Sequence, residues 1–405
     1  MNASVEQLWA ETFHYAREHS PFYREQFRGI TSLPPLHEVR PVDKQVLSAR
    51  NLDFLCLPRE RVVEIVTTSG TTGQPLLWML SEADLRRLAC NERLSFQCAG
   101  LAARDTVLVA VAMDRCFMAG LAYCLGLREL GCAVIRTGPA SPVLVLEMIE
   151  RLQPAAIVAV PSFLHVITAK AQDTGFELKN SSIKKIIGIG EPLRNRDLSL
   201  NPSGRALAES WGAQLYSTYG VTELANSLCE CEAGAGGHLH SEQLCLEVLG
   251  DDDRPVADGE VGELVATTWG VEAMPLIRYR TGDCAALFGA PCSCGRTTPR
   301  LGPILGRKNQ KLKFKGVSVF PSSLQAVLEQ TQGVKTFVII ARAQNELCDS
   351  IEVLVEGTAS LTELRQALQG RSKIVPQIRR ASREEIEALQ MPLRARKRRL
   401  FVDLR

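Results

Sequence analysis

The sequence has no long apolar run and no strong excess of charge of either sign. No stretch reaches the roughly 18 consecutive apolar residues that a membrane-spanning helix requires, so no membrane partner is expected. The 47 basic and 45 acidic residues give a formal net charge of +2, which argues against nucleic acid as an obligate partner. The opening MNASVEQLWAETFHYAREHS is charged from Glu6 onward and lacks the apolar core of a signal peptide, so a cytoplasmic protein is expected.

The chain also lacks internal repeats, low-complexity tracts and the even cysteine count of a disulfide framework. Its 13 cysteines are an odd number in 405 residues, so metal ligands and buried thiols are expected rather than structural disulfides. A chain of this length is too long for one hydrophobic core, and two or more domains are therefore predicted.

Short apolar runs alternate with helical patterns between residues 105 and 219. The runs TVLVAVA, AVIRTG, AIVAVP, KKIIGIG and AQLYSTYG are typical of strands. The run FMAGLAYCLGLREL and the segment from Val143 to Leu152 are typical of helices. This alternation predicts an α/β fold with layered, mostly parallel sheets.

Strand patterns dominate from about Gln243 to Leu287, in LCLEVLG, GELVATTW and PLIRYRTGDCAALF, and they predict a smaller β subdomain. After LGPILGR the pattern changes to β-α-β-β-α, from KLKFKGVSVF to LTELRQALQG. We therefore predict an N-terminal domain over residues 1–306 and a small α+β C-terminal domain over residues 307–405.

The loop within VEIVTTSGTTGQPLLW, residues 63–78, is rich in hydroxyls and glycines. Glycines let a backbone turn tightly and approach a ligand, and hydroxyls with free N–H groups in such a turn form an anion-binding concavity. A polyphosphate fits this description, although no Gly-Lys-Ser/Thr follows and the loop is not a Walker P-loop. The alternative is an ordinary flexible Ser/Gly turn.

Five further motifs follow this loop in a fixed order. They are IGEPL (189–193), YSTYGVTE (216–223), IRYRTGD (277–283), GRKNQKLKFKG (306–316) and RARKRRLF (394–401). Together the six resemble the ordered motifs of the adenylate-forming acyl-CoA synthetase superfamily, over nearly the whole chain. SPFYREQF, GLRELGCAVI and GVSVFP make phenylacetate-CoA ligase the most similar branch. The resemblance implies that the C-terminal domain is mobile.

The resemblance also implies roles for single residues. The loop at 67–73 would hold the β- and γ-phosphates of ATP, Tyr219 would stack on the purine, and Glu223 would help to hold Mg²⁺. Asp283 would accept hydrogen bonds from the ribose hydroxyls, and Arg307 would reach ribose or phosphate. The complete predicted ATP- or AMP-binding set, apart from Glu223, is Thr68, Ser69, Gly70, Thr71, Thr72, Gly73, Gly190, Glu191, Pro192, Tyr219, Gly220, Asp283 and Arg307.

Lys397 matches the lysine that supplies positive charge during adenylation in this family. The alternative is a basic solvated tail or a nucleic-acid-binding patch, because four arginines surround it. Three positions depart from the family pattern: Gln74 stands where a basic residue is common, Asn309 replaces the usual hinge aspartate, and Arg396 replaces a glycine.

The acyl-binding and thiol-binding residues are expected in two other segments. MDRCFMAGLAY (113–123) aligns with the segment that lines the aryl pocket of phenylacetate-CoA ligases, and Phe117 and Gly120 fit that role. Asp114 and Arg115 would either meet a polar substituent of the acid or face solvent. Gly316 would let the pantetheine arm of coenzyme A pass close to the backbone.

Two cysteine-bearing segments, CECEAGAGGHLH (229–240) and PCSCGRTTPR (291–300), predict a metal site. Thiolates and an imidazole in a closed set of four suit structural Zn²⁺, and some relatives of phenylacetate-CoA ligase have a similar zinc knot. The predicted ligands are Cys231, His238, Cys292 and Cys294. Cys229 and His240 compete with them, and free buried thiols are the alternative to a metal.

These observations predict an ATP-dependent carboxylate ligase that uses Mg²⁺. It would activate an aryl or other small acid as acyl-AMP and pass the acyl group to coenzyme A. One alternative loads the phosphopantetheine of an acyl carrier protein, and another is a catalytically lapsed, zinc-stabilised binding protein. The sequence leaves the oligomeric state open, with a homodimer among the options.

Overall fold

The computed structural model describes residues 4–68, 76–314, 317–345, 348–372, 374–391 and 399–405. The chain forms two compact units. The first contains the residues up to Thr281 together with Ala285–Ile304, and the second contains Gly282–Cys284 and Leu305–Arg405. We predicted a domain over residues 1–306 that binds ATP and the acyl group, and a mobile domain over residues 307–405. These boundaries and roles stay predictions.

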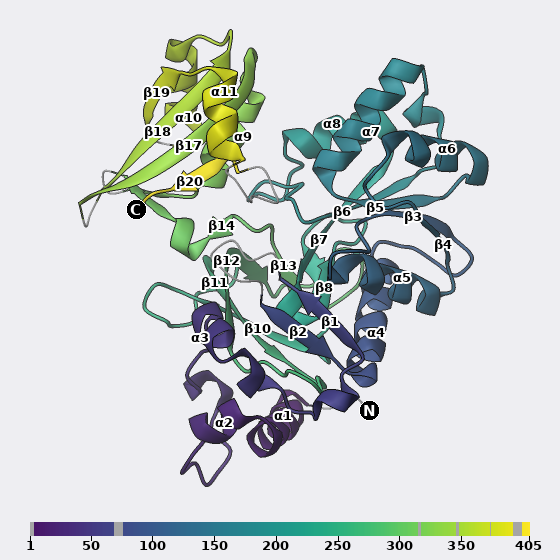
Figure 1. Ribbon diagram of the computed structural model, residues 1–405, viewed down its shortest axis with the longest axis vertical. Coiled ribbons are helices and arrows are strands. Elements are labelled where there is room, and N and C mark those ends of the chain that lie inside the picture. Colours follow the sequence, from purple (N-terminus) through teal and green to yellow (C-terminus); the bar gives the residue numbers. More distant parts are fainter. Residues whose placement is uncertain (1–3, 69–75, 315–316, 346–347, 373, 392–398) are drawn as a thin grey trace. The chain divides into compact units, whose positions relative to one another are not determined.

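The first unit contains a mostly parallel sheet in the order β4-β3-β5-β6-β7-β8 (Figure 1). Its strands are β3 (Thr106–Ala110), β4 (Ala133–Arg136), β5 (Ala156–Ala159), β6 (Lys185–Ile189), β7 (Gln214–Val221) and β8 (Asn226–Cys229). The helices that pack on it are α4 (Glu82–Cys98), α5 (Met118–Leu130), α6 (Pro142–Leu152), α7 (Pro161–Thr174) and α8 (Pro202–Trp211). Neighbouring strands are parallel as far as β7, and β8 returns antiparallel.

Both faces of the sheet are buried at its central strands β3, β5 and β6, which explains why these three strands are apolar almost throughout. Side chains alternate between the faces of a strand. In β3, Leu108 and Ala110 lie in the core shared with α6, α7 and α8. Val107 and Val109 lie in the core shared with α4 and α5. The predicted α/β architecture is confirmed.

A second sheet of the first unit has the order β10-β11-β12-β13-β9. Its strands are β9 (Gly237–His238), β10 (Leu244–Leu249), β11 (Val261–Thr268), β12 (Tyr279–Phe288) and β13 (Arg300–Leu301). A hairpin of β1 (Glu64–Thr67) and β2 (Leu77–Leu80) and the helices α1 (Val5–His19), α2 (Pro21–Gln26) and α3 (Lys44–Ala49) complete the unit. An aromatic core that includes Phe13, Tyr23 and Phe54 joins these elements.

Strand β12 begins later than the sequence pattern predicts. PLIRYRTGDCAALF alternates like one strand, but the strand starts at Tyr279. The residue before it, Arg278, has a φ of 48°, in the left-handed region that an extended strand does not use. The apolar residues Leu276 and Ile277 are buried in the core ahead of this bend.

The second unit is an α+β domain. A sheet in the order β19-β18-β17-β20 consists of β17 (Val334–Asn345), β18 (Cys348–Gly357), β19 (Gln377–Arg380) and β20 (Phe401–Asp403). The other elements are β14 (Gly306–Arg307), a hairpin of β15 (Leu312–Phe314) and β16 (Val317–Val319), and the helices α9 (Pro321–Gln330), α10 (Leu361–Ser372) and α11 (Arg383–Gln390). KLKFKGVSVF, expected as one strand, thus contains two.

Among the residues that the structure describes, no helix combines the length and the apolar character that crossing a membrane demands.

Candidate active site

Glu223 is the most deeply buried acid among the residues predicted to bind the nucleotide. It lies in a short 3-10 helix, Thr222–Leu224, between β7 and β8, and only 3% of it is exposed. Lys44 Nζ donates to its Oε1 at 3.0 Å, and the Tyr279 hydroxyl lies 3.2 Å from the same oxygen. Neither partner could be predicted from the sequence, because the contacts span 179 and 56 positions of the chain and leave no local pattern.

The segment Gly190–Pro192 follows β6 at the carboxyl end of the parallel sheet. Gly190 has a φ of 73°, which favours glycine, and no atom within 4 Å would meet a Cβ there. The Glu191 carboxylate accepts hydrogen bonds from Ser162 N at 2.8 Å and Ser162 Oγ at 2.7 Å, at the start of α7. Carboxylates are favourable at helix N-termini, so Glu191 fixes this segment to the scaffold.

Tyr219 and Gly220 lie in β7, four and three residues before Glu223, respectively. Tyr219 is half-buried and Gly220 is exposed. Ligands of open parallel sheets bind at the carboxyl ends of the strands. The segments after β6 and β7 are placed as that rule requires.

Thr68 is the described residue at the start of the predicted phosphate loop. It is buried, its N–H donates to Leu76 O at 3.1 Å, and within the described chain its hydroxyl oxygen has no hydrogen-bond partner. Gly316 and Lys397 lie outside the described residues. So do the remaining residues predicted for the phosphate loop, Ser69, Gly70, Thr71, Thr72 and Gly73.

Asp283 and Arg307 form a pair within the second unit. They are directly opposed in the antiparallel pairing of β12 with β14. Arg307 Nε lies 3.3 Å from Asp283 Oδ1, and Asp283 is buried while Arg307 is exposed. A buried carboxylate with an adjacent guanidinium can accept hydrogen bonds from hydroxyls and attract an anion at the same place.

The segment predicted to line the acyl pocket contains strained backbone. Arg115 and Cys116 have φ of 58° and 55°, and the side chains of Asp114 and Arg115 are largely exposed. Phe117 precedes α5 and is 38% exposed. A Cβ on Gly120 would lie 2.2 Å from Ala112 O, so backbone packing alone accounts for this glycine. The acyl-pocket roles of Phe117 and Gly120 stay predictions.

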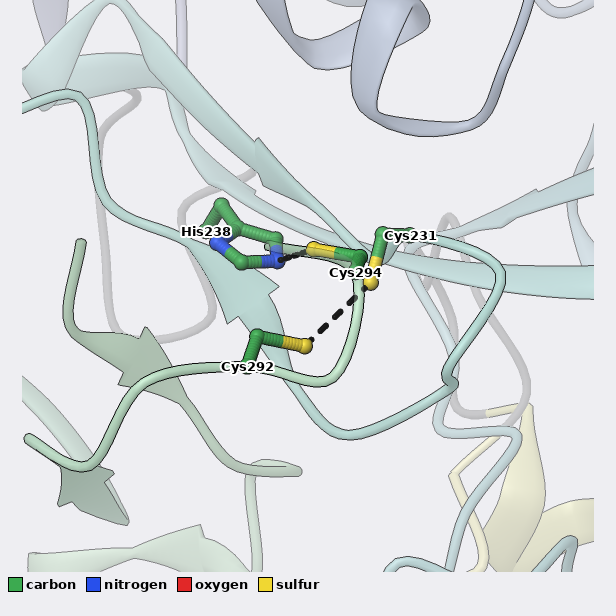
Figure 2. Close-up of side chains that lie close together, drawn as sticks. All are labelled: Cys231, His238, Cys292 and Cys294. Carbon is green, nitrogen blue, oxygen red and sulfur yellow. Dashed lines mark hydrogen bonds between the residues drawn. The ribbon is translucent and has the colours of Figure 1, made fainter. Parts of the chain in front are cut away.

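The four predicted metal ligands converge in one place (Figure 2). Their ligand atoms all lie within 4.8 Å of one another. Cys231 Sγ is 3.6 Å from Cys292 Sγ, and Cys294 Sγ is 3.5 Å from His238 Nε2. The pairing of β9 with β13, which opposes His238 and Arg300, brings the two cysteine-bearing segments together.

The geometry of this cluster fits a tetrahedral Zn²⁺, although binding would have to displace the proton of Cys231, whose pKa burial raises to about 12. Ligands at about 2.3 Å around such an ion are separated by roughly 3.8 Å, close to the distances found. Burial, with nearby arginines, lowers the pKa of His238 to about 4, so its imidazole is neutral at pH 7. Burial raises the pKa of Cys294, but hydrogen bonds from Arg296 and the neighbouring thiols outweigh it and lower that pKa to about 7. Thr298 Oγ1 lies 3.1 Å from His238 Nδ1 and can fix the tautomer.

The two competing ligands lie outside this cluster. Thr218 Oγ1 donates to the buried Cys229 sulfur at 3.2 Å, and burial raises the pKa of Cys229 well above its ordinary value. His240 Nε2 lies 3.3 Å from Ser95 Oγ. Both side chains therefore have partners of their own, and the sequence alone could not separate them from the four.

Comparison with known proteins identifies the family of this chain. A family model described as AMP-binding enzyme matches residues 33–272. The phenylacetate-coenzyme A ligase of Thermus thermophilus is 30% identical over 372 residues, which cover 88% of this chain and 81% of the relative. The phenylacetate-coenzyme A ligase of Escherichia coli is 28% identical over 374 residues, covering 87% and 83%.

Among solved structures, 2-hydroxyisobutyryl-CoA ligase in the postadenylation state is similar in fold. The TM-score is 0.82 at 21% identity, and the match covers 99% of this chain and 89% of that one.

Proposed function

We propose that this chain, which belongs to the AMP-binding enzyme family, is an ATP-dependent carboxylate ligase that transfers an acyl group to coenzyme A. One observation of the structure carries the proposal. The YSTYGVTE segment ends a parallel strand at a buried carboxylate, Glu223, that is held by a lysine and a tyrosine. A fixed, buried acid at a sheet's carboxyl edge suits a metal–nucleotide site.

The reaction consists of two displacements. A carboxylate oxygen of the acid attacks the α-phosphorus of ATP, the bond to the β-phosphate oxygen breaks, and pyrophosphate leaves. The thiol then attacks the acyl carbon, loses its proton to solvent, and expels AMP. Mg²⁺, held in part by Glu223, would neutralise phosphate charge in the first step.

Glu191 and Tyr219 would position the nucleotide. Glu191 fixes the Gly190–Pro192 backbone to α7 through Ser162, so that adenine meets a rigid surface. Tyr219 would stack on the purine. Asp283 would accept hydrogen bonds from the ribose hydroxyls beside the positive charge of Arg307.

The acid is proposed to be an aryl or other small carboxylic acid. Two of the similar proteins are phenylacetate-coenzyme A ligases, and a structural neighbour is a 2-hydroxyisobutyryl-CoA ligase. Coenzyme A is the proposed acceptor for the same reason, and a carrier-protein phosphopantetheine is the alternative. A homodimer stays a prediction.

We also propose one structural Zn²⁺ in the cluster of Cys231, His238, Cys292 and Cys294. Three thiolates and one neutral imidazole make a closed set of four donors with no open position for substrate. This ion would therefore stabilise the fold and take no part in the chemistry.

Acid-dependent ATP–pyrophosphate exchange tests the function. We expect Mg²⁺-dependent exchange with at least one acid of a panel that includes phenylacetate, benzoate and 2-hydroxyisobutyrate. Glu223→Gln should lower the exchange rate by about 10²-fold, since it removes the negative charge that helps hold the metal. Exchange absent over the panel would favour the lapsed binding protein.

Glu230→Gln is the matched control for Glu223→Gln. Glu230 is equally buried and is also paired with a cation, Arg194, at 2.6 Å. Its substitution should lower stability without changing the Mg²⁺ concentration that half-saturates exchange. An equal effect of both substitutions on Mg²⁺ dependence would remove Glu223 from the metal site.

A further inference from the structure

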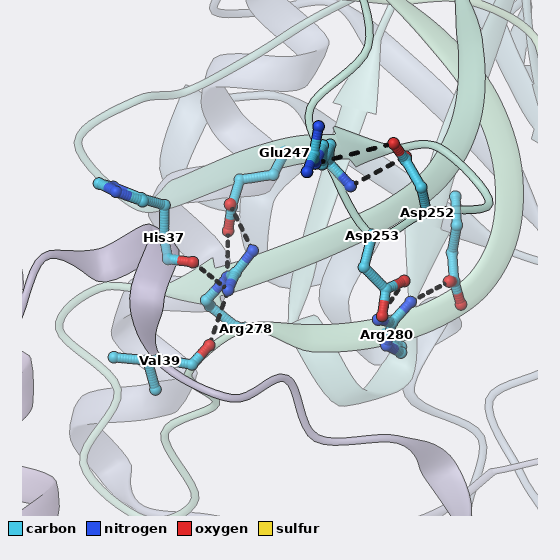
Figure 3. A network of polar contacts seen from close by, with 9 residues as sticks. His37, Val39, Glu247, Asp252, Asp253, Arg278 and Arg280 are labelled. Carbon is cyan, nitrogen blue, oxygen red and sulfur yellow. Dashed lines mark hydrogen bonds and ion pairs between the residues drawn. The ribbon is translucent and has the colours of Figure 1, made fainter.

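Arg278 is a buried arginine whose guanidinium has four hydrogen bonds (Figure 3). Two of them go to Glu247 Oε2 and Oε1, at 3.0 and 2.9 Å. The other two go to the carbonyls of His37 and Val39, at 2.6 and 2.7 Å. Arg278 is 5% exposed, so these bonds are shielded from competing water.

The backbone of Arg278 holds the same N-terminal segment. We call residues 36–44 the strap. Val42 N donates to Arg278 O at 2.9 Å, and Val42 O accepts from Arg280 N at 2.8 Å. Arg278 N in turn donates to Thr267 Oγ1 at 3.0 Å. One residue thus fixes the strap at three carbonyl or amide groups and is itself fixed to β11.

Two segments held by Arg278, the strap and the start of β12, each provide a side chain that contacts Glu223. The strap runs into α3, whose first residue Lys44 bonds Glu223 Oε1. The residue after Arg278 is Tyr279, whose hydroxyl lies next to the same oxygen. Within the described part of the chain, the hydrogen bonds to this carboxylate both end on Oε1. The orientation they impose leaves Oε2 for another partner.

We propose that Arg278 is a positioning residue for Glu223. It acts through the strap and through Tyr279 to orient the carboxylate so that Oε2 meets the cation of Mg²⁺–ATP. This role rests on the proposed function, because it assumes that Glu223 holds the metal. Groups that orient a metal ligand typically affect metal affinity by about 10- to 100-fold.

The backbone of Arg278 supports a positional role. A φ of 48° costs free energy at any residue other than glycine, and such strain persists only where the surroundings over-determine it. Glycine or asparagine would adopt this φ more readily, but neither has a side chain that reaches Glu247 and two carbonyls. The site therefore combines a strained backbone with a side chain that requires a planar fork of donors.

Arg278→Lys is the variant of choice, because lysine keeps the charge and loses the fork. We expect the Mg²⁺ concentration that half-saturates ATP binding, measured by calorimetry without any acid, to rise about 3- to 10-fold. Hydrogen exchange at the Val42 amide should also accelerate, because that amide bonds to Arg278. Glu247→Gln, which weakens the same guanidinium, should shift Mg²⁺ dependence in the same direction.

Arg280→Lys is the matched control. Arg280 lies two residues further along, in β12, and its side chain pairs with Glu263 and Asp253. Its substitution should lower the melting temperature to a similar extent and leave the half-saturating Mg²⁺ within about twofold of the parent. A loss of Mg²⁺ affinity that merely reflects a weakened fold would appear in both variants.

A double-mutant cycle with Lys44→Met tests whether Arg278 acts on Glu223 through the strap. If Arg278 acts through the strap, Lys44→Met alone should raise the half-saturating Mg²⁺, and adding Arg278→Lys should raise it by less than the product of the two factors. The proposal would be overturned if the double variant raised the half-saturating Mg²⁺ by the full product of the two single-variant factors. It would also be overturned if Arg278→Lys left the Mg²⁺ dependence unchanged. Wild-type protein that binds Mg²⁺–ATP but exchanges pyrophosphate with no acid would instead overturn the proposed function.

Discussion

Glu92 shows how a single side chain makes stability depend on pH. It lies on α4 and is buried, with Ser227 Oγ donating to its Oε2 at 2.7 Å. A Cβ on Gly126 of α5 would lie 2.2 Å from Glu92 Cβ, so close helix packing excludes water here. Burial raises the pKa of Glu92 to about 8, although the Ser227 hydrogen bond lowers it, and the folded protein holds a neutral acid at pH 7.

Glu92→Gln should therefore stabilise the protein at high pH. Between the ordinary pKa of 4.5 and about 8, the folded state keeps a proton that the unfolded state has lost, so wild-type stability falls as pH rises through this range. A neutral amide removes that loss. We expect the variant to gain on the order of 2–4 kcal/mol over the wild type at pH 8 and little at pH 5, measured by denaturant unfolding.

Glu129→Gln is the control for Glu92→Gln. Glu129 is paired with Arg93 at 3.0 Å, and its side chain is 39% exposed. The change should shift stability by only a few tenths of a kcal/mol, about what a surface pair contributes. A Glu92→Gln variant whose difference from wild type stays constant from pH 5 to pH 8 would show that Glu92 is ionised in the folded protein.

Residue contacts also show the limits of sequence reasoning. The family motifs predicted Glu223, and the cysteine spacing predicted a metal cluster whose four side chains do converge. Lys44 and Tyr279 were missed, because a contact between distant segments produces no local periodicity. Glu191 was expected beside adenine, and no pattern indicated that its carboxylate caps α7 through Ser162.

At the scale of elements, hydrophobic periodicity predicted the strands of the parallel sheet well. The central strands β3, β5 and β6 are apolar and buried on both faces, and the pattern is strong for that reason. The start of β12 was wrong because Arg278 bends the backbone at a position where the apolar pattern continues. In the second unit, LTELRQALQG was the last element predicted, because the later α11 is largely polar and β20 has only three residues.

We predict that a zinc ion bound by the four-residue cluster cross-links two distant segments of the first unit. It links the segment after β8 with the loop between β12 and β13, about sixty residues further along. We expect about one zinc per chain, measured by mass spectrometry of metals. Cys292→Ser should lose the metal and lower the melting temperature, because binding of a structural ion contributes directly to folding free energy.

Cys229→Ser controls for the loss of any buried thiol. Cys229 is as buried as Cys292 but bonds to Thr218 outside the cluster. This variant should keep its zinc. Metal-free Cys292→Ser protein with an unchanged melting temperature would show that the thiols are simply buried, as would wild-type protein without metal.

At the scale of the whole molecule, the residues predicted to act in the reaction belong to both units. Glu223 belongs to the first unit, and Asp283 with Arg307 belongs to the second. Lys397 and Gly316 lie in the stretch of sequence that forms the second unit, although outside the described residues. We predict that the two half-reactions use different groups of this unit, because one lysine and one thiol cannot occupy the same face of the acyl phosphate.

Lys397→Ala should therefore separate the half-reactions. A positioned cation that acts in one transition state is typically worth about 10² to 10³ in rate, so ATP–pyrophosphate exchange should fall by that factor. A supplied acyl-adenylate should still react with coenzyme A at close to the parent rate. Gly316→Leu should give the opposite result, with exchange retained and thioester formation blocked, because a side chain would obstruct the pantetheine arm.

The neighbouring arginines make the Lys397 measurement specific. Arg398→Ala and Arg399→Ala each remove one positive charge from the same stretch, yet a solvated charge beside the site is screened by salt. Each should change exchange by less than about threefold at physiological ionic strength. If Lys397→Ala keeps nearly full exchange, the catalytic cation is a neighbouring arginine. If it abolishes both half-reactions equally, the C-terminal segment stabilises the fold and Lys397 has no role specific to one step.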